Sequence, residues 1–226
     1  MPETKILESA LLRKHGFANA FSLRSSDPVS DLRAVLGERP LYQVHQVHGA
    51  RVVRAEGAVD DLRKVEADAL IARGDVFVGV RVADCVPVLA GAIGGGVAAI
   101  HAGWRGVVQG IVAKALAELA KDGSGRKVAA IGPCIGSCCF EVGADVARQI
   151  EEASGGAGVV ARREGEKAYV DLRKAVRAQL RAAGLFDEDI EDVPGCTKCD
   201  AARFFSFRRD GANAGRHLGV IAPQVA

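Results

Sequence analysis

Residues 76–106 read VFVGVRVADCVPVLAGAIGGGVAAIHAGWRG and carry the clearest structural pattern in the chain. The β-branched runs at 76–82 and 97–100 predict two strands, and the glycines at 94–96 predict a turn between them, so we expect a hairpin of neighbouring strands. Residues 105–121 then place apolar side chains three and four positions apart, which is typical of an amphipathic helix that ends at Gly123. This helix is expected to pack on the sheet.

The remainder of the chain alternates strands and helices in the same way. Residues 127–131 predict a strand, residues 145 to about 153 a helix, and Asp171 caps a further helix that ends at Gly184. The segments ARFFSFRR and RHLGVIA flank the turn-forming DGANAG, which predicts a second hairpin. With no internal repeat and no low-complexity linker, the sequence predicts an α/β fold in which residues 1–226 form a single layered domain of sheets and helices.

Composition excludes several classes of protein. The 226 residues carry 30 Lys and Arg against 28 Asp and Glu, and only 5% are aromatic, which suits neither a nucleic-acid nor an anionic lipid surface. The longest apolar run, 76–100, is interrupted by Arg81, Asp84 and glycines, so no membrane helix is expected. The amino-terminal MPETKILESALLRKHG lacks the apolar core of a secretory signal. We therefore expect a cytoplasmic protein whose six cysteines are thiols, ligands or a nucleophile.

Three segments concentrate groups that can bind metal: QVHQVHG at 43–49, ADCVP at 83–87 and HAGWRG at 101–106. His48, Cys85 and His101 together offer two imidazoles and a thiolate, a donor set that suits Zn²⁺ and leaves a fourth position open for catalysis. Cys85 and His101 follow apolar strands, where side chains leave the core. The alternative is a buried thiol and two histidines bonded to the backbone. Asp84 could orient an imidazole or cap a turn.

The other cysteines admit three interpretations. They are Cys134, Cys138, Cys139, Cys196 and Cys199, in GPCIGSCCF and GCTKC. A structural site of four cysteines and a CxxC redox pair are both conceivable. We favour buried or turn thiols, because one half lacks the two-residue spacing and Cys199 is followed by a β-rich stretch rather than by a helix.

An anionic substrate would need a bidentate cationic partner. The arginines nearest the segments above are Arg105, Arg203, Arg208, Arg209 and Arg216. We expect either Arg208 or Arg209, at the mouth of the second predicted hairpin, to bind a phosphate or carboxylate group.

Six segments together resemble the laccase-domain family, also called the polyphenol-oxidase-like or YfiH family, over roughly residues 43–221. They are QVHGARVV, VRVADCVPVLA, AAIHAGWRG, AAIGPCIGSCCFEVG, DLRKAVRAQL and CTKCDAARFFSFRRDGANAGRHLGVIA. The resemblance implies a single α/β domain with a zinc site at His48, Cys85 and His101. It also implies purine nucleoside phosphorylase activity, with adenosine deaminase and methylthioadenosine phosphorylase activities. Before residue 43 the chain has SLRSSDPVSDLR in place of the family's glycine-rich turn and Asn-Leu-Gly segment, and His45 has no assigned role.

The name of the family implies copper oxidation of phenols, which the histidine count argues against. A multicopper laccase needs roughly eight or more histidines and commonly an axial thioether. This chain has five histidines, at 15, 45, 48, 101 and 217, and its single methionine is Met1. Copper could still occupy the same three ligands, but not as a multicopper centre.

The expected substrates are purine nucleosides and inorganic phosphate. Phosphorolysis requires an anion site, assigned here to Arg208, together with a dry pocket and a proton donor. Deamination requires a metal-activated water and a carboxylate proton shuttle, for which Glu66 and Glu141 are candidates. The alternatives are a metal-free cysteine hydrolase with Cys85 as nucleophile and His101 as base, and an interaction module in which zinc pins two hairpins.

Overall fold

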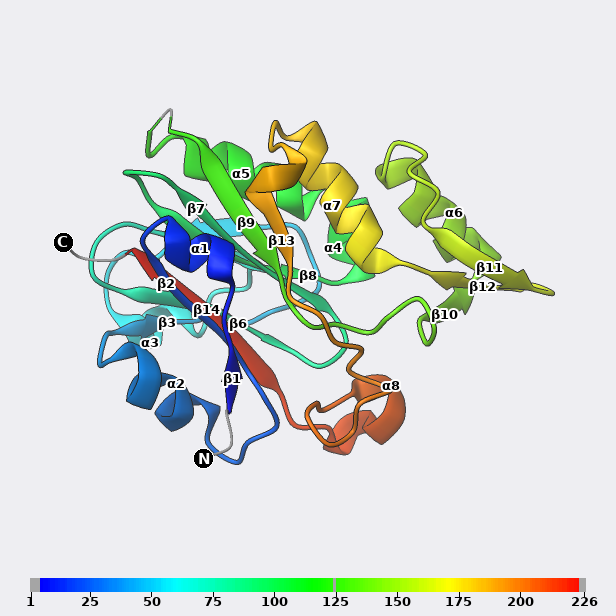
Figure 1. Ribbon diagram of the computed structural model, residues 1–226, viewed down its shortest axis with the longest axis horizontal. Coiled ribbons are helices and arrows are strands. Elements are labelled where there is room, and N and C mark those ends of the chain that lie inside the picture. Colours follow the sequence, from blue (N-terminus) through cyan, green and yellow to red (C-terminus); the bar gives the residue numbers. More distant parts are fainter. Residues whose placement is uncertain (1–4, 124, 224–226) are drawn as a thin grey trace.

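Two β-sheets stacked face to face form the centre of the computed structural model, which describes residues 5–123 and 125–223 (Figure 1). Residues 1–4 of the charged amino-terminal segment discussed above lie outside the described residues. Helices cover the outer face of each sheet, so the fold is the mixed α/β class that the sequence predicted.

The larger sheet has six strands in the order β13–β9–β7–β8–β5–β4. Its strands are β4 (Val52–Arg54), β5 (Ala69–Ala72), β7 (Val86–Ala92), β8 (Val97–Ala102), β9 (Lys127–Ile131) and β13 (Ile190–Asp192). Every residue of β7 and β8 is buried, because this sheet is covered on both faces, which explains their nearly continuous apolar sequence. β7 and β8 pair antiparallel with Val86 opposite Ala102.

The second sheet has five strands in the order β1–β2–β14–β6–β3. Its strands are β1 (Ile6–Leu7), β2 (Phe17–Ser22), β3 (Leu41–Tyr42), β6 (Phe77–Val82) and β14 (His217–Pro223). Its inner face packs on the larger sheet through one shared apolar cluster. The Phe17 ring lies so close to Gly91 that a Cβ there would be 2.4 Å from it, so glycine is what allows this approach between the sheets.

Helices complete the layers. They are α1 (Ala10–Lys14), α2 (Pro28–Leu36), α3 (Val59–Leu62), α4 (Trp104–Val108), α5 (Ile111–Ala120), α6 (Ala144–Ala153), α7 (Leu172–Ala182) and α8 (Phe207–Asp210), with 3-10 turns η1 (Asp187–Asp189) and η2 (Gly211–Asn213). α4 to α7 pack on the outer face of the larger sheet, and α2 packs on the outer face of the second. The Asp171 carboxylate accepts the Lys174 N–H, which confirms the predicted cap of α7.

A small antiparallel sheet lies beside α6 at the edge of the molecule (Figure 1). Its strands are β10 (Glu141–Gly143), β11 (Val160–Glu164) and β12 (Lys167–Val170), in the order β10–β12–β11. Residues 132–140 form the loop through which the chain passes from β9 to β10.

Three sequence expectations are wrong in detail. The partner of β8 in the hairpin is β7, whereas β6 belongs to the other sheet and pairs with β14 and β3. The helix predicted over 105–121 is two helices, because Gly110 adopts a left-handed φ of 76° between α4 and α5. The second predicted hairpin does not form, because residues 207–213 make α8 and η2 instead of a two-residue turn.

Candidate metal-binding active site

His48, Cys85 and His101 converge at one end of the larger sheet. His101 lies in β8, Cys85 directly precedes β7, and His48 lies in the loop between β3 and β4. One side-chain ligand atom from each residue lies within 4.8 Å of those of the other two. The hairpin register places Pro87 opposite His101 and Val86 opposite Ala102, so Cys85 and His101 come together by strand pairing alone.

Asp68, a residue that we did not predict, orients two members of this cluster. Its fully buried carboxylate lies 2.7 Å from His101 Nδ1, which leaves Nε2 to face Cys85 and His48. The same carboxylate accepts the backbone N–H groups of His48 at 2.9 Å and Gly49 at 2.7 Å. Carboxylates that bind the second ring nitrogen of a ligating histidine are typical of metal sites. A sequence signal did exist, because Asp68 is an acidic residue directly before the apolar strand β5.

The backbone at the cluster is strained. His48 has a φ of 62° and Asp84 a φ of 88°, and these are the non-glycine residues at positive φ in the described chain. Strain of this kind costs about 1–3 kcal/mol per residue and gathers at functional sites. At both positions the surrounding hydrogen bonds to carboxylates hold the conformation.

The cluster surrounds a space that suits an ion. A Cβ at Gly103 would lie 3.1 Å from His48 Cδ2 and 3.3 Å from Cys85 Sγ, so this glycine keeps the space open. Two imidazoles and a thiol, with an oriented second nitrogen on one ring, form a donor set that fits Zn²⁺ or copper. The residues therefore fit a metal, and Cys85 and His101 are not packed as ordinary core side chains.

The pKa values of Cys85 and His101 are shifted in opposite directions, each toward its charged form. Although burial opposes ionisation, the neighbouring imidazoles lower the pKa of the Cys85 thiol to about 6. Burial likewise opposes protonation of His101, yet the Cys85 thiolate and Asp68 raise its pKa to about 9. The thiolate form is the one that binds metal or attacks an electrophile.

A cavity of about 660 Å³ opens beside the three residues. Its apolar walls are the side chains of Trp104, Ile135, Phe140 and Phe207, and His45 also lines it. This volume lies in the range of small-molecule sites, and aromatic walls of this kind can stack on a planar ligand.

Four guanidinium groups line the same cavity, those of Arg81, Arg105, Arg208 and Arg216. Within residues 5–123 and 125–223 none of them forms an ion pair with a carboxylate. The Asp84 carboxylate also lines the cavity, but it accepts the Arg208 N–H at 2.6 Å and the Ser206 hydroxyl at 3.1 Å. Asp84 therefore caps the segment before α8, and the orienting carboxylate is Asp68.

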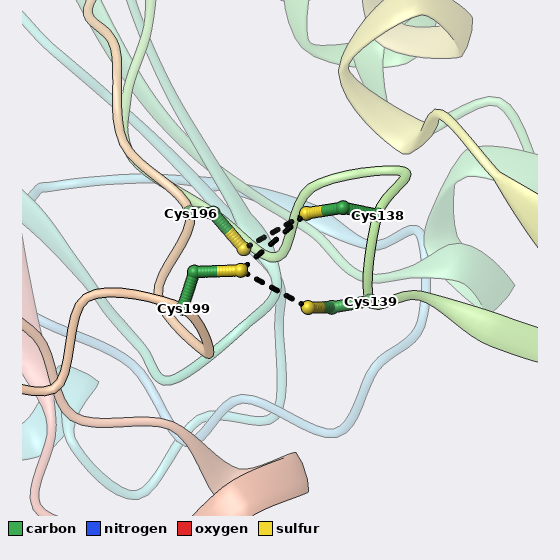
Figure 2. A group of neighbouring side chains, drawn as sticks. All are labelled: Cys138, Cys139, Cys196 and Cys199. Atoms are coloured by element: carbon green, nitrogen blue, oxygen red, sulfur yellow. Dashed lines mark hydrogen bonds between the residues drawn. The ribbon is translucent and has the colours of Figure 1, made fainter.

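The five remaining cysteines separate into two groups. Cys134 is fully buried, and burial raises the pKa of its thiol to about 11. Cys138, Cys139, Cys196 and Cys199 gather outside the cavity with their sulfur atoms facing one another (Figure 2). The sequence favours buried or turn thiols over a four-cysteine site, whereas the structure brings these four residues together.

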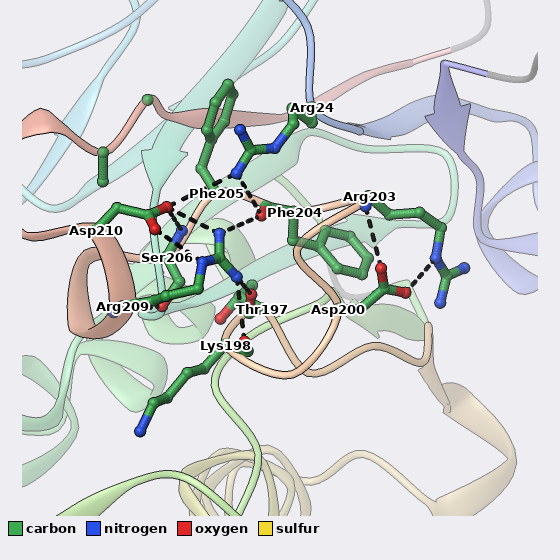
Figure 3. Close-up of polar contacts among 12 residues, drawn as sticks. Arg24, Thr197, Lys198, Asp200, Arg203, Phe204, Phe205, Ser206, Arg209 and Asp210 are labelled. Atoms are coloured by element: carbon green, nitrogen blue, oxygen red, sulfur yellow. Dashed lines mark hydrogen bonds and ion pairs between the residues drawn. The ribbon is translucent and has the colours of Figure 1, made fainter.

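Arg208 and Arg209 point to different surroundings. Arg209 uses its guanidinium on the Thr197, Lys198 and Phe204 carbonyl oxygens and on Asp210, as Figure 3 shows. Arg208 reaches the cavity, where one of its nitrogens donates to the Glu141 carbonyl oxygen at 2.9 Å. Arg208 is therefore the member of the pair that can meet a ligand, and Arg203 instead pairs with Asp200.

Neither glutamate considered for proton transfer lines the cavity. The Glu141 carboxylate binds Lys167 and Tyr169, and these hydrogen bonds lower its pKa. Glu66 contacts its surroundings through its backbone, which bridges to His45. The structure therefore gives no support to either residue as a shuttle.

In the described part of the chain, no helix combines the length and apolar character needed to cross a membrane.

Two stacked sheets with a His–Cys–His cluster beside a basic, aromatic-walled cavity define a class of layered α/β proteins with a site suited to metal. The family described as "Multi-copper polyphenol oxidoreductase laccase" matches residues 29–224, and the chain belongs to this family. The resemblance to the laccase-domain or YfiH family is thereby confirmed.

Solved structures share the fold. A hypothetical protein YfiH of Bacillus licheniformis superposes with a TM-score of 0.87 at 22% identity, covering 98% of this chain and 97% of that one. YlmD of Geobacillus stearothermophilus gives a TM-score of 0.82 at 25% identity, covering 99% of this chain and 100% of that one.

Curated relatives carry the names of nucleoside enzymes. "Adenosine deaminase RL5" from an unknown prokaryotic organism is 42% identical over 66% of this chain and 59% of its own length. "Purine nucleoside phosphorylase" of Xylella fastidiosa is 35% identical over 74% of this chain and 66% of its own length. The chain thus spans about three fifths to two thirds of these relatives.

Proposed function

We propose that the protein is a zinc-dependent purine nucleoside phosphorylase, a single-domain cytoplasmic enzyme that cleaves adenosine, inosine and methylthioadenosine with inorganic phosphate. Adenosine deamination is proposed as a secondary activity. The names of the curated relatives support both reactions.

The observation that carries the proposal is the placement of four arginines in the cavity beside His48, Cys85 and His101, none of them paired with a carboxylate of the described residues. A guanidinium binds phosphate through two parallel hydrogen bonds, and a cavity with several such groups favours a multiply charged anion. Phosphorolysis requires inorganic phosphate, whereas deamination does not. The electrostatics therefore favour phosphorolysis as the main reaction.

The chain's own residues have distinct roles in this proposal. Arg208 binds phosphate, held in place by its backbone bond to Asp84 and by the Glu141 carbonyl oxygen. Trp104, Phe140 and Phe207 bind the purine ring and exclude water, because aromatic faces stack on bases. His48, Cys85 and His101 would hold zinc, with Asp68 fixing the ring of His101. When bound, zinc supplies Lewis-acid polarisation of a substrate oxygen or a water molecule.

The test is to incubate the purified protein with inosine or adenosine, with and without phosphate. Phosphorolysis of inosine should release hypoxanthine and ribose 1-phosphate, and omission of phosphate should abolish both products. Deamination of adenosine should release inosine and ammonia without phosphate. Absence of free base under all conditions, with zinc bound, would overturn the phosphorylase proposal.

A metal-free cysteine hydrolase is the second candidate, because Cys85, His101 and Asp68 form a thiolate, imidazolium and carboxylate series. A chelator separates the two proposals. Removing zinc should abolish a zinc-dependent reaction, whereas it would leave or increase hydrolysis by a free Cys85 thiolate. Alkylation of Cys85 should abolish both reactions.

A further inference from the structure

The second group of cysteines has the geometry of a metal site. Cys138 and Cys139 lie in the loop after β9, and Cys196 and Cys199 lie in the segment after β13. All four are free thiols whose sulfur atoms lie within 4.8 Å of one another. Three pairs of sulfur atoms lie particularly close, at 3.6 Å for Cys138 to Cys196, 3.6 Å for Cys138 to Cys199 and 3.3 Å for Cys139 to Cys199 (Figure 2).

These separations fit shared coordination better than any other arrangement of four thiols. Sulfur atoms at about 2.3 Å from a tetrahedral zinc ion lie about 3.8 Å apart, so the three pairs at 3.3–3.6 Å need to move by only about 0.2–0.5 Å to share an ion. A disulfide would require about 2.0 Å between two sulfurs. Core packing does not explain the cluster either, because Cys138 and Cys199 are exposed.

The backbone around the cluster is already arranged to hold it. Cys134 and Cys196 form a parallel β-bridge, with the Thr197 N–H donating to the Cys134 carbonyl oxygen at 3.0 Å, which fixes the two segments side by side. The Gly136 N–H donates to Cys196 Sγ at 3.2 Å, a hydrogen bond of the kind that orients a metal-binding thiolate. A Cβ at Gly136 would lie 3.2 Å from Cys138 Sγ, so glycine gives the loop room to close around the sulfurs.

We propose that Cys138, Cys139, Cys196 and Cys199 form a second, structural site that binds one zinc ion as a tetrathiolate. Binding replaces the four thiol protons by the ion, releases those protons and changes no oxidation state. Four protein ligands fill the tetrahedral shell and leave no position for substrate, which is the pattern of a structural site. None of the four cysteines lines the described cavity, so this site is separate from His48, Cys85 and His101.

The position of the cluster indicates what the ion would stabilise. Arg209 donates to the carbonyl oxygens of Thr197 and Lys198, the two residues between Cys196 and Cys199 (Figure 3). Arg208 directly precedes Arg209 in α8, and it lines the cavity. Zinc at the four cysteines would thus fix the turn to which α8 is attached, and with it the position of Arg208.

Zinc analysis of the purified protein tests the proposal. Cys85→Ala should lose the zinc of the first site and retain about one equivalent at the four cysteines. This measurement of zinc content does not depend on the proposed enzymatic activity. Cys199→Ser should lose the second metal and keep the first, and the double variant should hold none. Cys134→Ala is the matched control, a cysteine of the same loop outside the cluster, and should keep the full metal content.

X-ray absorption on zinc-loaded Cys85→Ala provides a measurement that does not require a variant of the cluster. A shell of four sulfurs at about 2.3 Å is expected. Zinc-free Cys85→Ala protein, a mixed nitrogen and sulfur shell, or recovery of the four cysteines as disulfides would each overturn the proposal. If the zinc-loaded wild type holds one equivalent and Cys85→Ala holds none, the only zinc site is the one at His48, Cys85 and His101, and the proposal is overturned.

Discussion

Asp68 Oδ1 lies 2.7 Å from His101 Nδ1, and the same carboxylate accepts the backbone N–H of His48. One buried side chain therefore fixes the orientation of one candidate ligand and the loop of another. Burial alone would raise the pKa of Asp68, but the His101 ring and the Gly49 and His48 amides lower it, so the carboxylate stays ionised.

Replacement of Asp68 by Asn should weaken zinc binding at the first site about 10–100-fold, the usual effect of removing such a partner. The asparagine side chain would also turn its NH₂ group toward the backbone N–H groups that now donate to the Asp68 carboxylate. The affinity is measured by competition with a chromophoric chelator in the Cys199→Ser background, which leaves a single proposed site. Asp60→Asn, at an exposed carboxylate of α3, is the control, and equal affinities in the two variants would contradict the role of Asp68.

Gly103→Ala should disturb the same cluster by crowding rather than by strain. Gly103 has an ordinary φ of −69°, so alanine can adopt its backbone, but the new methyl group would lie 3.1 Å from His48 and 3.3 Å from Cys85. We expect reduced zinc content and reduced turnover, with the far-ultraviolet circular dichroism of the wild type. Full zinc occupancy and unchanged turnover would show that the space beside Gly103 is not needed.

Much of this site could be predicted because the apolar pattern makes two strands clear: Cys85 follows β6, and His101, expected just past a strand, lies within β8. The predicted pairing of residues 76–82 with residues 97–100 is wrong because the residues between them form a further strand, β7, which pairs with β8. Strand propensity alone does not determine which strands are neighbours in a sheet. Asp68 was missed because its role depends on β5 lying next to β8, a contact between distant segments. The convergence of Cys138 and Cys139 with Cys196 and Cys199 depends likewise on the parallel pairing of β13 with β9.

Phenol oxidation should not be detected, whatever metal is supplied. Among the described residues, His48 and His101 share one cluster with Cys85, whereas His217 is buried against Phe204 and Phe205 elsewhere. A multinuclear copper centre needs many more imidazoles in one place. Oxygen consumption with a phenolic substrate measures this after copper loading. Steady turnover together with several bound copper ions would contradict the prediction.

Acid should destabilise the protein through His217. Burial lowers the pKa of this histidine below its ordinary value, and its Nε2 accepts the Phe205 N–H at 2.7 Å, a bond that protonation would break. The folded state thus binds this proton less readily than the unfolded state. The stabilising effect is complete above pH about 6.5 and is lost as the pH falls through the folded pKa.

The His217 prediction is measured as the difference in free energy of unfolding between the wild type and His217→Gln. Groups common to both proteins cancel in this difference, so the advantage of the wild type should narrow between pH 7.5 and pH 5.5. The ring resonances of His217 should show a titration midpoint below that of an exposed histidine. A difference that stays constant with pH would contradict the argument.

Arg208→Ala should weaken phosphate binding, whereas Arg209→Ala should lower the stability of the fold, although the two residues are adjacent. Arg208 lines the cavity and makes one side-chain bond to the protein, so its loss should leave the fold intact. Removing one charge-assisted partner of phosphate costs about 1.5–3 kcal/mol, which raises the Michaelis constant for phosphate by about one to two decades. Deamination, which uses no phosphate, should change less.

Arg209 binds three backbone carbonyl oxygens and Asp210, so its removal should instead lower the free energy of unfolding by about 1–3 kcal/mol. For a chain of this size that corresponds to a melting temperature lower by about 2–12 °C. Thermal unfolding and phosphate-dependent kinetics of both variants measure the two effects. Equal loss of phosphorolysis and deamination in Arg208→Ala, without a rise in the Michaelis constant for phosphate, would show that Arg208 has no phosphate-binding role.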